Sequence, residues 1–123
     1  MESNVIASGE IIIENRIFNL RGMQVMIDRD LAELYGVETK VLNQAVKRNI
    51  ERFPPQFRLQ LTDNDLSELV TICDRFEKLK HSSSLPYAFT EQGVAMLSAV
   101  LKSGTAVKVS IQIIQTFEKC ANS

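Results

Sequence analysis

The chain has 123 residues, of which 45% are hydrophobic and 24% are charged, and its formal net charge at pH 7 is −1. This length suits one compact domain, and the composition is that of a globular protein and not of a disordered one. No apolar run is long enough to cross a bilayer, and the N-terminus lacks the basic and apolar regions of a signal peptide. We therefore expect a cytoplasmic protein that has no membrane partner.

Few residues are suited to metal binding or catalysis. His81 is the only histidine, and Cys73 and Cys120 belong to no C-x-x-C pair, so both cysteines are expected to be buried apolar side chains. The chain has no Gly-rich phosphate loop, nucleophile elbow or H-E-x-x-H motif. We expect no enzyme activity, no metal site, no cofactor and no small-molecule substrate.

Three short runs near the N-terminus are apolar and β-branched, which is typical of strands: Ile11–Ile13, Ile17–Leu20 and Val25–Ile27. The tripeptide Arg21-Gly22-Met23 predicts a hairpin turn between the last two, because Gly22 can adopt a positive φ. Residues 1–10 are expected to form a tail outside the domain.

The segment Asp28–Glu51 predicts two helices with a turn at Gly36. An acidic first turn opens the first helix at Asp28, and Gly36 ends it. Thr39 is the predicted N-cap of the second helix, which extends to about Glu51 before two prolines stop the chain from continuing as a helix.

The second half of the chain predicts a strand pair and three helices. Gln56–Leu61 alternates polar and apolar residues, as a half-buried strand does, and Tyr87–Phe89 can pair with it. A capping box opens a helix over residues 62–80, Thr90 caps the next helix, and Ser103-Gly104 separates the last one. Together the elements predict an α+β fold: an N-terminal β-hairpin, a helix-turn-helix, a short β pairing and C-terminal helices in one compact domain.

Basic side chains are concentrated in one segment of the chain. Residues 1–38 carry three basic and seven acidic side chains, whereas residues 39–60 carry five basic side chains against Glu51 alone. A nearly neutral protein is a weak argument against nucleic-acid binding, but this local excess is a basic footprint of the kind that attracts phosphates.

The second helix of the predicted pair has an apolar and a polar face. The apolar side holds Leu42, Ala45, Val46 and Asn49, and the opposite side holds Lys40, Gln44, Lys47 and Glu51, flanked by Asn43 and Arg48. Asn and Gln can form paired hydrogen bonds with adenine, and Lys and Arg can reach guanine or phosphate. Ala32 and Gly36 allow the two helices to cross closely, as in a DNA-reading helix-turn-helix. We predict that the side chains contacting double-stranded DNA are Thr39, Lys40, Asn43, Gln44, Lys47, Arg48, Arg52 and Arg58.

The same pattern also fits the ordinary solvated surface of two packed helices, and pattern alone does not decide between the two interpretations. Glu51 lies on the polar face and counts against a phosphate at that end. Arg58 lies on a strand that either acts as a wing touching a phosphate or is a plain edge strand with a polar outer face.

The last predicted helix has an unusually wide apolar surface. It is formed by Val107, Val109, Ile111, Ile113, Ile114 and Phe117. One interpretation is that this helix is the central core element of the domain. If part of the surface is exposed, a homodimer is the simplest expectation, and it would place two reading helices on a symmetric site. The rival function is therefore a protein-interaction module that captures a partner protein through this helix, with little DNA binding.

Two long blocks, "VMIDRDLAELYGVETKVLNQAVKRNIERFPPQFRLQLT" and "LPYAFTEQGVAML", resemble the phage-derived KilA-N-type DNA-binding domains, and most of all their ORF-six-N branch, which is related to Bro-N domains of viral proteins. The resemblance runs from about Ile11 to about Phe117. It implies a DNA-binding domain of prophage or mobile-element origin, similar to those of phage antirepressors and transcriptional regulators. The basic motifs of the family fall in this chain on Lys40, Asn43, Lys47, Arg48, Asn49 and Arg52.

Relatives of this kind commonly continue into a helical or coiled C-terminal part. We therefore expect the domain to occupy residues 11–119, and residues 120–123 to be a tail at which a longer protein is cut.

Overall fold

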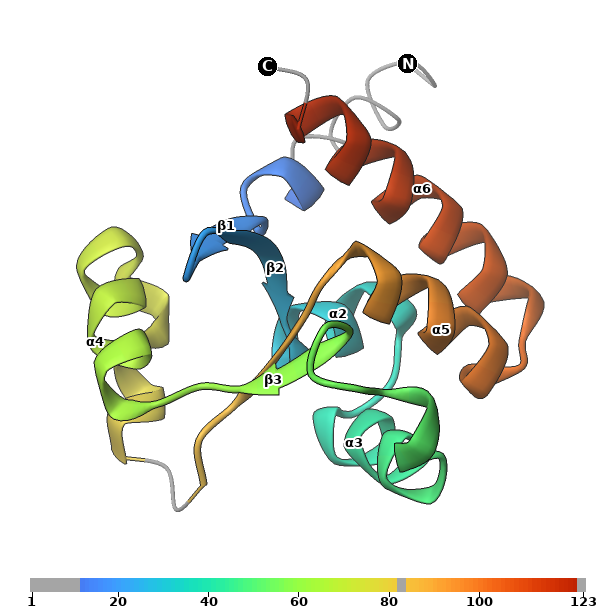
Figure 1. Ribbon diagram of the computed structural model, residues 1–123, viewed down its shortest axis with the longest axis horizontal. Coiled ribbons are helices and arrows are strands. Elements are labelled where there is room, and N and C mark those ends of the chain that lie inside the picture. Colours follow the sequence, from blue (N-terminus) through green and yellow to red (C-terminus); the bar gives the residue numbers. More distant parts are fainter. Residues whose placement is uncertain (1–11, 82–83, 122–123) are drawn as a thin grey trace.

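The computed structural model describes residues 12–81 and 84–121 and has a four-stranded antiparallel sheet at its centre (Figure 1). The spatial order of the strands is β1-β2-β4-β3. Their bounds are Phe18–Leu20 for β1, Met23–Ile27 for β2, Arg58–Gln60 for β3 and Tyr87–Phe89 for β4. The predicted α+β class is confirmed.

Helices cover both faces of the sheet, as Figure 1 shows with α4 on one side and α5 and α6 on the other. One face packs against α4 (Asp63–Ile72) and the 3₁₀ helix η2 (Asp74–His81). The other packs against α2 (Asp28–Tyr35), α3 (Thr39–Arg48), α5 (Glu91–Leu101) and α6 (Gly104–Ala121).

The alternation of side chains along β2 explains why the protein has two hydrophobic clusters. Val25 and Ile27 belong to the cluster under α4, whereas Met26 belongs to the cluster under α5 and α6, and all three are fully buried. Successive side chains of a strand point to opposite faces, so Val25–Ile27, the part of β2 that is covered on both sides, is apolar at every position.

The predicted hairpin between β1 and β2 is confirmed. Arg21 and Gly22 both have positive φ, 53° and 78°, which is the conformation of the two central residues of a type I′ turn. The predicted pairing of Tyr87–Phe89 with the strand after α3 is also confirmed, with Leu59 opposite Ala88. The pairing of β4 with β2, which places Met26 opposite Phe89, had no local signal in the sequence.

The strand predicted at Ile11–Ile13 is wrong for the part that the structure describes. Residues 12–14 form a helical turn, closed by hydrogen bonds from the Arg16 amide to the Ile13 carbonyl and from the Ile17 amide to the Glu14 carbonyl. Ile13 is buried in the same cluster as Phe117 of α6, while Ile12 is exposed. A three-residue apolar run does not distinguish strand from helix, and tertiary packing decided here. Ile11 and the predicted tail at residues 1–10 lie outside the described residues.

The helix predicted over residues 62–80 is interrupted. Its capping box is confirmed, because the Thr62 hydroxyl accepts from the Asp65 amide and the Asp65 carboxylate accepts from the Thr62 amide. However, α4 ends at Ile72, Cys73 has an extended backbone, and the chain continues as η2. This change of path buries Phe76 completely against the sheet, so a tertiary contact overrides the local helical preference.

Several smaller boundaries also differ from the predictions. The strand predicted at Gln56–Leu61 is reduced to Arg58–Gln60, because Pro54 accepts hydrogen bonds from the Phe57 and Arg58 amides in a preceding turn. The expected tail includes two residues of α6, Cys120 and Ala121. Cys73 and Cys120 are half-buried and not fully buried as expected. Within residues 12–81 and 84–121, none of the helices has the length and apolarity that a membrane span requires.

Candidate nucleic-acid interface

The turn between α2 and α3 has a defined geometry that follows from Gly36. This glycine adopts the left-handed conformation, with φ 74° and ψ 30°. The Val37 amide donates to the Ala32 carbonyl at 2.9 Å, and the Gly36 amide donates to the Glu33 carbonyl at 3.2 Å. These two bonds form a Schellman motif, which satisfies the last carbonyls of α2 and turns the chain sharply into α3. Ala32 is buried where the helices meet.

The predicted division of α3 into a buried and an exposed side is confirmed by its burial. Leu42 and Val46 are fully buried, and Ala45 and Asn49 are half-buried. The exposed side chains are Lys40, Val41, Gln44, Lys47 and Arg48. Four of these five carry a charge or an amide, so α3 presents a polar, basic face to solvent.

The predicted ends of α3 need correction. Glu38 and not Thr39 occupies the N-cap position, without a side-chain capping bond, and Thr39 is the first helical residue. The helix ends at Arg48, and Asn49 closes it by donating from its side-chain amide to the Ala45 carbonyl at 2.9 Å. The next residues form the 3₁₀ helix η1 (Ile50–Arg52), on which Arg52 is exposed.

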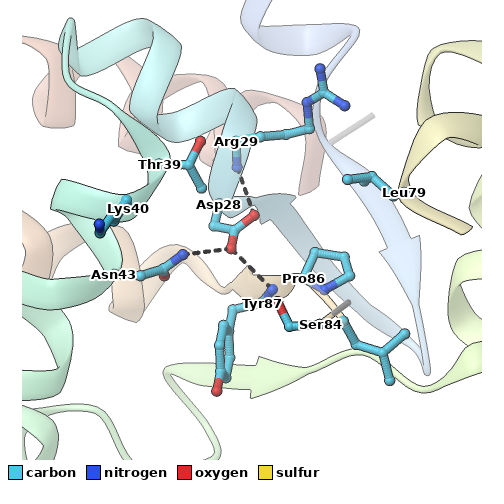
Figure 2. Close-up of a pocket in the computed structure, with 10 residues that line it drawn as sticks. Asp28, Arg29, Thr39, Lys40, Asn43, Leu79, Ser84, Pro86 and Tyr87 are labelled. Atoms are coloured by element: carbon cyan, nitrogen blue, oxygen red, sulfur yellow. Dashed lines mark hydrogen bonds between the residues drawn. The ribbon is translucent and has the colours of Figure 1, made fainter. Parts of the chain in front are cut away.

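Asn43 lies at the border of the exposed face and is tied to the fold. Its side-chain amide donates to the Asp28 carboxylate at 2.9 Å (Figure 2). Asp28 is 4% exposed and also accepts from the backbone amides of Arg29 at 2.7 Å and Tyr87 at 3.3 Å. Burial raises the pKa of the Asp28 carboxyl, and the three donors act in the opposite direction. Asn43 therefore joins α3 to α2 and β4, which the helical projection did not reveal.

A cavity of about 500 Å³ opens beside the first turn of α3 (Figure 2). It is lined by Thr39 and Lys40 of α3, by Arg29 of α2 and by Pro86 and Tyr87 on the far side. Arg29 is exposed, and sequence reasoning missed it because nothing local shows that α2 brings a cation to the start of α3. The buried Oδ1 atom of Asn43 has no hydrogen-bond partner among the described residues.

Arg58 on β3 is held by an aromatic ring. Its guanidinium lies 3.9 Å from the centroid of the Tyr87 ring, and both residues are half-buried. Stacking uses the flat face of the guanidinium and leaves the N–H groups in its plane able to donate. Tyr87 of β4 lines the same cavity as Lys40. Arg58, stacked on Tyr87, and the start of α3 therefore belong to one continuous surface.

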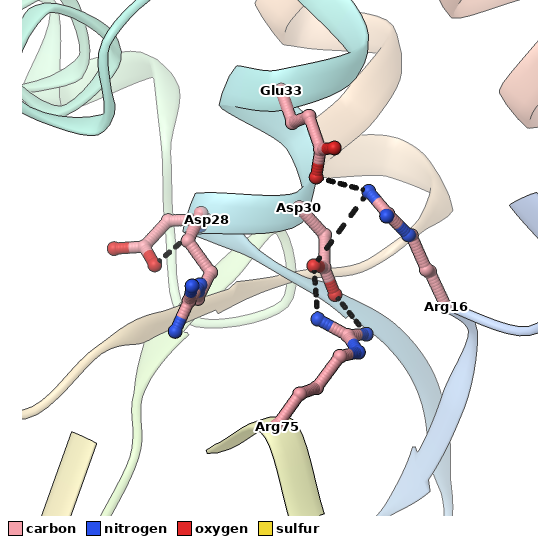
Figure 3. A network of polar contacts seen from close by, with 6 residues as sticks. Arg16, Asp28, Asp30, Glu33 and Arg75 are labelled. Carbon is pink, nitrogen blue, oxygen red and sulfur yellow. Dashed lines mark hydrogen bonds and ion pairs between the residues drawn. The ribbon is translucent and has the colours of Figure 1, made fainter. Parts of the chain in front are cut away.

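Most arginines outside this surface are paired with carboxylates. Figure 3 shows the largest group, in which Arg75 donates to both oxygens of Asp30 at 2.5 and 2.8 Å. Arg16 contacts Glu33 at 2.6 Å and Asp30 at 3.9 Å. Asp30 is 1% exposed, so these pairs fasten α2 to η2 and to the segment before β1. Arg21, in the turn between β1 and β2, pairs with the largely buried Asp65 of α4.

The basic residues of α3 and η1 differ from these arginines. Within the described part of the chain, no carboxylate lies within ion-pair distance of Lys40, Lys47, Arg48 or Arg52. The structure thus has a helix that is packed into the core through Leu42 and Val46 and whose exposed cations have no carboxylate partner among the described residues. We call the surface formed by Arg29, Lys40, Gln44, Lys47, Arg48, Arg52 and Arg58 the basic face.

The start of α5 fixes the chain where it leaves α3 and η1. The Thr90 hydroxyl donates to the Gln56 carbonyl at 2.7 Å, and the Thr90 amide donates to the Phe57 carbonyl at 3.0 Å. A Cβ atom added to Gly93 would lie 2.1 Å from the Phe57 carbonyl oxygen, so only glycine permits this approach. The sequence stretch "TEQG" therefore positions the segment between Arg52 and Arg58.

The apolar surface predicted on the last helix is divided between core and solvent. Ile113 and Phe117 are buried, and Val109 and Ile114 are half-buried. Val107 and Ile111, one turn apart, are 46% and 52% exposed. Part of α6 is therefore a core element, and a narrow apolar strip of it faces outward.

A family model described as the ORF6N domain matches residues 15–100, from just before β1 through most of α5. The match covers well over half of the chain and confirms the resemblance to a phage-type, KilA-N-like domain. No curated protein and no solved structure matches the chain.

Proposed function

The chain belongs to the ORF6N domain family, and we propose that it binds double-stranded DNA through α3, as part of a prophage or mobile-element transcriptional regulator or antirepressor. One observation carries this proposal: Lys40, Lys47 and Arg48 lie around Gln44 on α3 and have no ion-pair partner within the described chain. Hydrogen bonds at the Gly36 turn and at Asn49 hold the two ends of this helix. Such cations bind a phosphate backbone favourably because they displace its condensed counterions.

The geometry of α2 and α3 suggests how the helices would meet DNA. In a helix-turn-helix, the second helix enters the major groove and the first crosses the backbone. Here α3 would place Gln44 at base edges, with Lys47 and Arg48 near one strand's phosphates. Arg29 and Lys40 at the other end of α3 would contact a further phosphate, and Arg58 would act from the adjoining strand.

Binding of a fluorescent mixed-sequence duplex, followed by anisotropy, tests this function. We expect the double variant Lys47→Ala, Arg48→Ala to weaken binding by more than about tenfold at moderate salt. A matched control, Lys78→Ala with Lys108→Ala, removes two exposed lysines from η2 and α6 and should bind as the unmodified protein does. Equal losses in both double variants, or no binding at low salt, would contradict the proposal. Circular dichroism checks that all variants fold.

A second function is favoured by the exposed strip on α6. Val107 and Ile111 could pack against the same residues of a second copy, and a twofold dimer would present two α3 helices to a symmetric site. Capture of a different partner protein through this strip is the alternative. Light scattering of the full chain and of Ile111→Lys separates these cases. A dimer that becomes monomeric in the variant supports self-association, and a monomer in both contradicts self-association through this strip.

A further inference from the structure

One exposed side chain of α3, the helix of the basic face, is apolar. Val41 is 47% exposed, and it belongs to neither hydrophobic cluster of the described chain. A β-branched residue at an exposed helical position also loses side-chain freedom without a packing gain, so it does not serve the stability of α3.

The position of Val41 on the helix is informative. Residues three and four apart on a helix lie on one side, so Val41, Gln44 and Arg48 form one strip along α3. Val41 is the third residue of the helix, and the N-terminal residues of a recognition helix are those that contact base edges. Val41 therefore lies in the half of α3 that would approach the bases most closely, and Gln44 follows it at the middle of the helix on the same side.

The chemistry of the major groove offers one apolar partner on its base edges. Every base presents donors or acceptors there, and only thymine adds a methyl group, at C5. Val41 has no donor or acceptor, so its γ-methyl groups can discriminate between bases only through that methyl. Gln44 complements it, because a glutamine amide can bond to both N6 and N7 of adenine.

Resting on the DNA-binding function proposed above, we infer that Val41 packs against the C5-methyl group of a thymine while Gln44 pairs with a nearby adenine. Neighbouring side chains on a helix face have Cβ atoms about 5–6 Å apart, and successive bases of one strand are about 3.4 Å apart along the axis. The two residues would then read positions within about two base pairs of each other. The preferred site therefore contains A·T pairs under the part of α3 that runs from Val41 to Gln44.

The inference can be tested by removing that one methyl group from the DNA. A preferred duplex is first selected from random sequences with the full chain. Each thymine of that duplex is then replaced singly by deoxyuridine, and affinity is measured by anisotropy. We expect one position at which the replacement lowers affinity by about fourfold, the loss expected for one buried methyl group. At that position Val41→Ala should bind both duplexes equally.

A control variant distinguishes base reading from general weakening. Lys47→Ala should bind both duplexes less tightly and keep the full thymine-to-deoxyuridine ratio. Val41→Ala should fold normally, because alanine is the better helix former. If Val41→Ala also keeps the ratio, or if no thymine position matters to the unmodified protein, the inference about Val41 fails while DNA binding stands. If no duplex is bound even at low salt, the proposed function fails as well.

Discussion

The side-chain amide of Asn43 on α3 donates a hydrogen bond of 2.9 Å to the buried carboxylate of Asp28 on α2. The same carboxylate oxygen accepts from the Tyr87 amide on β4. One carboxylate therefore links α2 and α3, which carry residues of the basic face, to β4, whose Tyr87 holds Arg58 of that face. Asn43, expected from the sequence to contact DNA, is placed where it orients the helix that carries the other candidates.

Replacing Asn43 with alanine removes a hydrogen-bond donor from the buried carboxylate of Asp28. We expect Asn43→Ala to lower the free energy of unfolding by about 1–3 kcal/mol, because a buried group is left with an unmade hydrogen bond. Urea unfolding followed by circular dichroism measures this, and the exposed Gln44→Ala serves as the control, with a change within about 0.5 kcal/mol. An unchanged stability combined with a large loss of DNA affinity would instead assign Asn43 to base contact.

The contact between Gly93 and the Phe57 carbonyl gives a sharper stability test. Gly93→Ala should destabilise the protein by about 3 kcal/mol or more, because its Cβ would lie 2.1 Å from a backbone oxygen that cannot rotate away. Gly104→Ala is a matched control, since an added Cβ there meets nothing within 4 Å. That control should be neutral or slightly stabilising. Similar melting temperatures for the two variants would refute the close approach of α5 to the Phe57 carbonyl.

The Asp30–Arg75 pair predicts an asymmetry between two arginine substitutions. Arg75→Ala leaves the buried Asp30 without its bidentate partner, and because the Arg75 side chain is one-third exposed the cost should be about 1.5–3 kcal/mol. Arg16→Ala removes a longer contact to Asp30 and a partly exposed contact to Glu33, so its cost should stay near 1 kcal/mol or below. Chemical unfolding of the two variants compares these costs directly. Equal effects would mean that Arg75 does not hold α2 against η2.

Asp65 predicts a defined dependence of stability on pH. Its hydrogen bonds from Arg21 hold the pKa of its carboxyl below the usual value, and the Thr62 amide and hydroxyl act in the same direction. A carboxyl whose pKa is lower in the folded state stabilises the protein above its unfolded pKa, about 3.9, and this stabilisation is lost as pH falls through the folded pKa. The difference in unfolding free energy between the protein and Asp65→Asn should therefore be full near pH 6 and shrink below about pH 4. A difference that does not change with pH would contradict this role.

Features set by neighbouring residues could be predicted from the sequence. The I′ hairpin at Arg21-Gly22, the left-handed Gly36 and the Thr62–Asp65 capping box each need only a few consecutive residues, because turn and cap geometries are local. The exposed and buried sides of α3 followed from its period for the same reason.

Features set by distant residues could not be predicted in this way. The Asp28–Asn43 bond and the Asp30–Arg75 pair join residues 15 and 45 positions apart, and no local pattern encodes them. The break at Cys73 and the helical turn at residues 12–14 depend on burying Phe76 and Ile13 against other elements. Arg29 was missed as a member of the basic face because only the packing of α2 on α3 brings it there.

The salt dependence of DNA affinity tests whether α3 is the DNA-binding helix. Titrations of one duplex at several salt concentrations give the slope of log K against log salt, which is about −0.9 for each phosphate neutralised. Four to six contacts from the basic face predict a slope of about −4 to −5, and Lys47→Ala with Arg48→Ala should reduce its magnitude by about 2. The Lys78→Ala, Lys108→Ala control should keep the full slope. A shallow slope in the unmodified protein, or one that the α3 substitutions leave unchanged, would contradict the assignment of α3 as the DNA-binding helix.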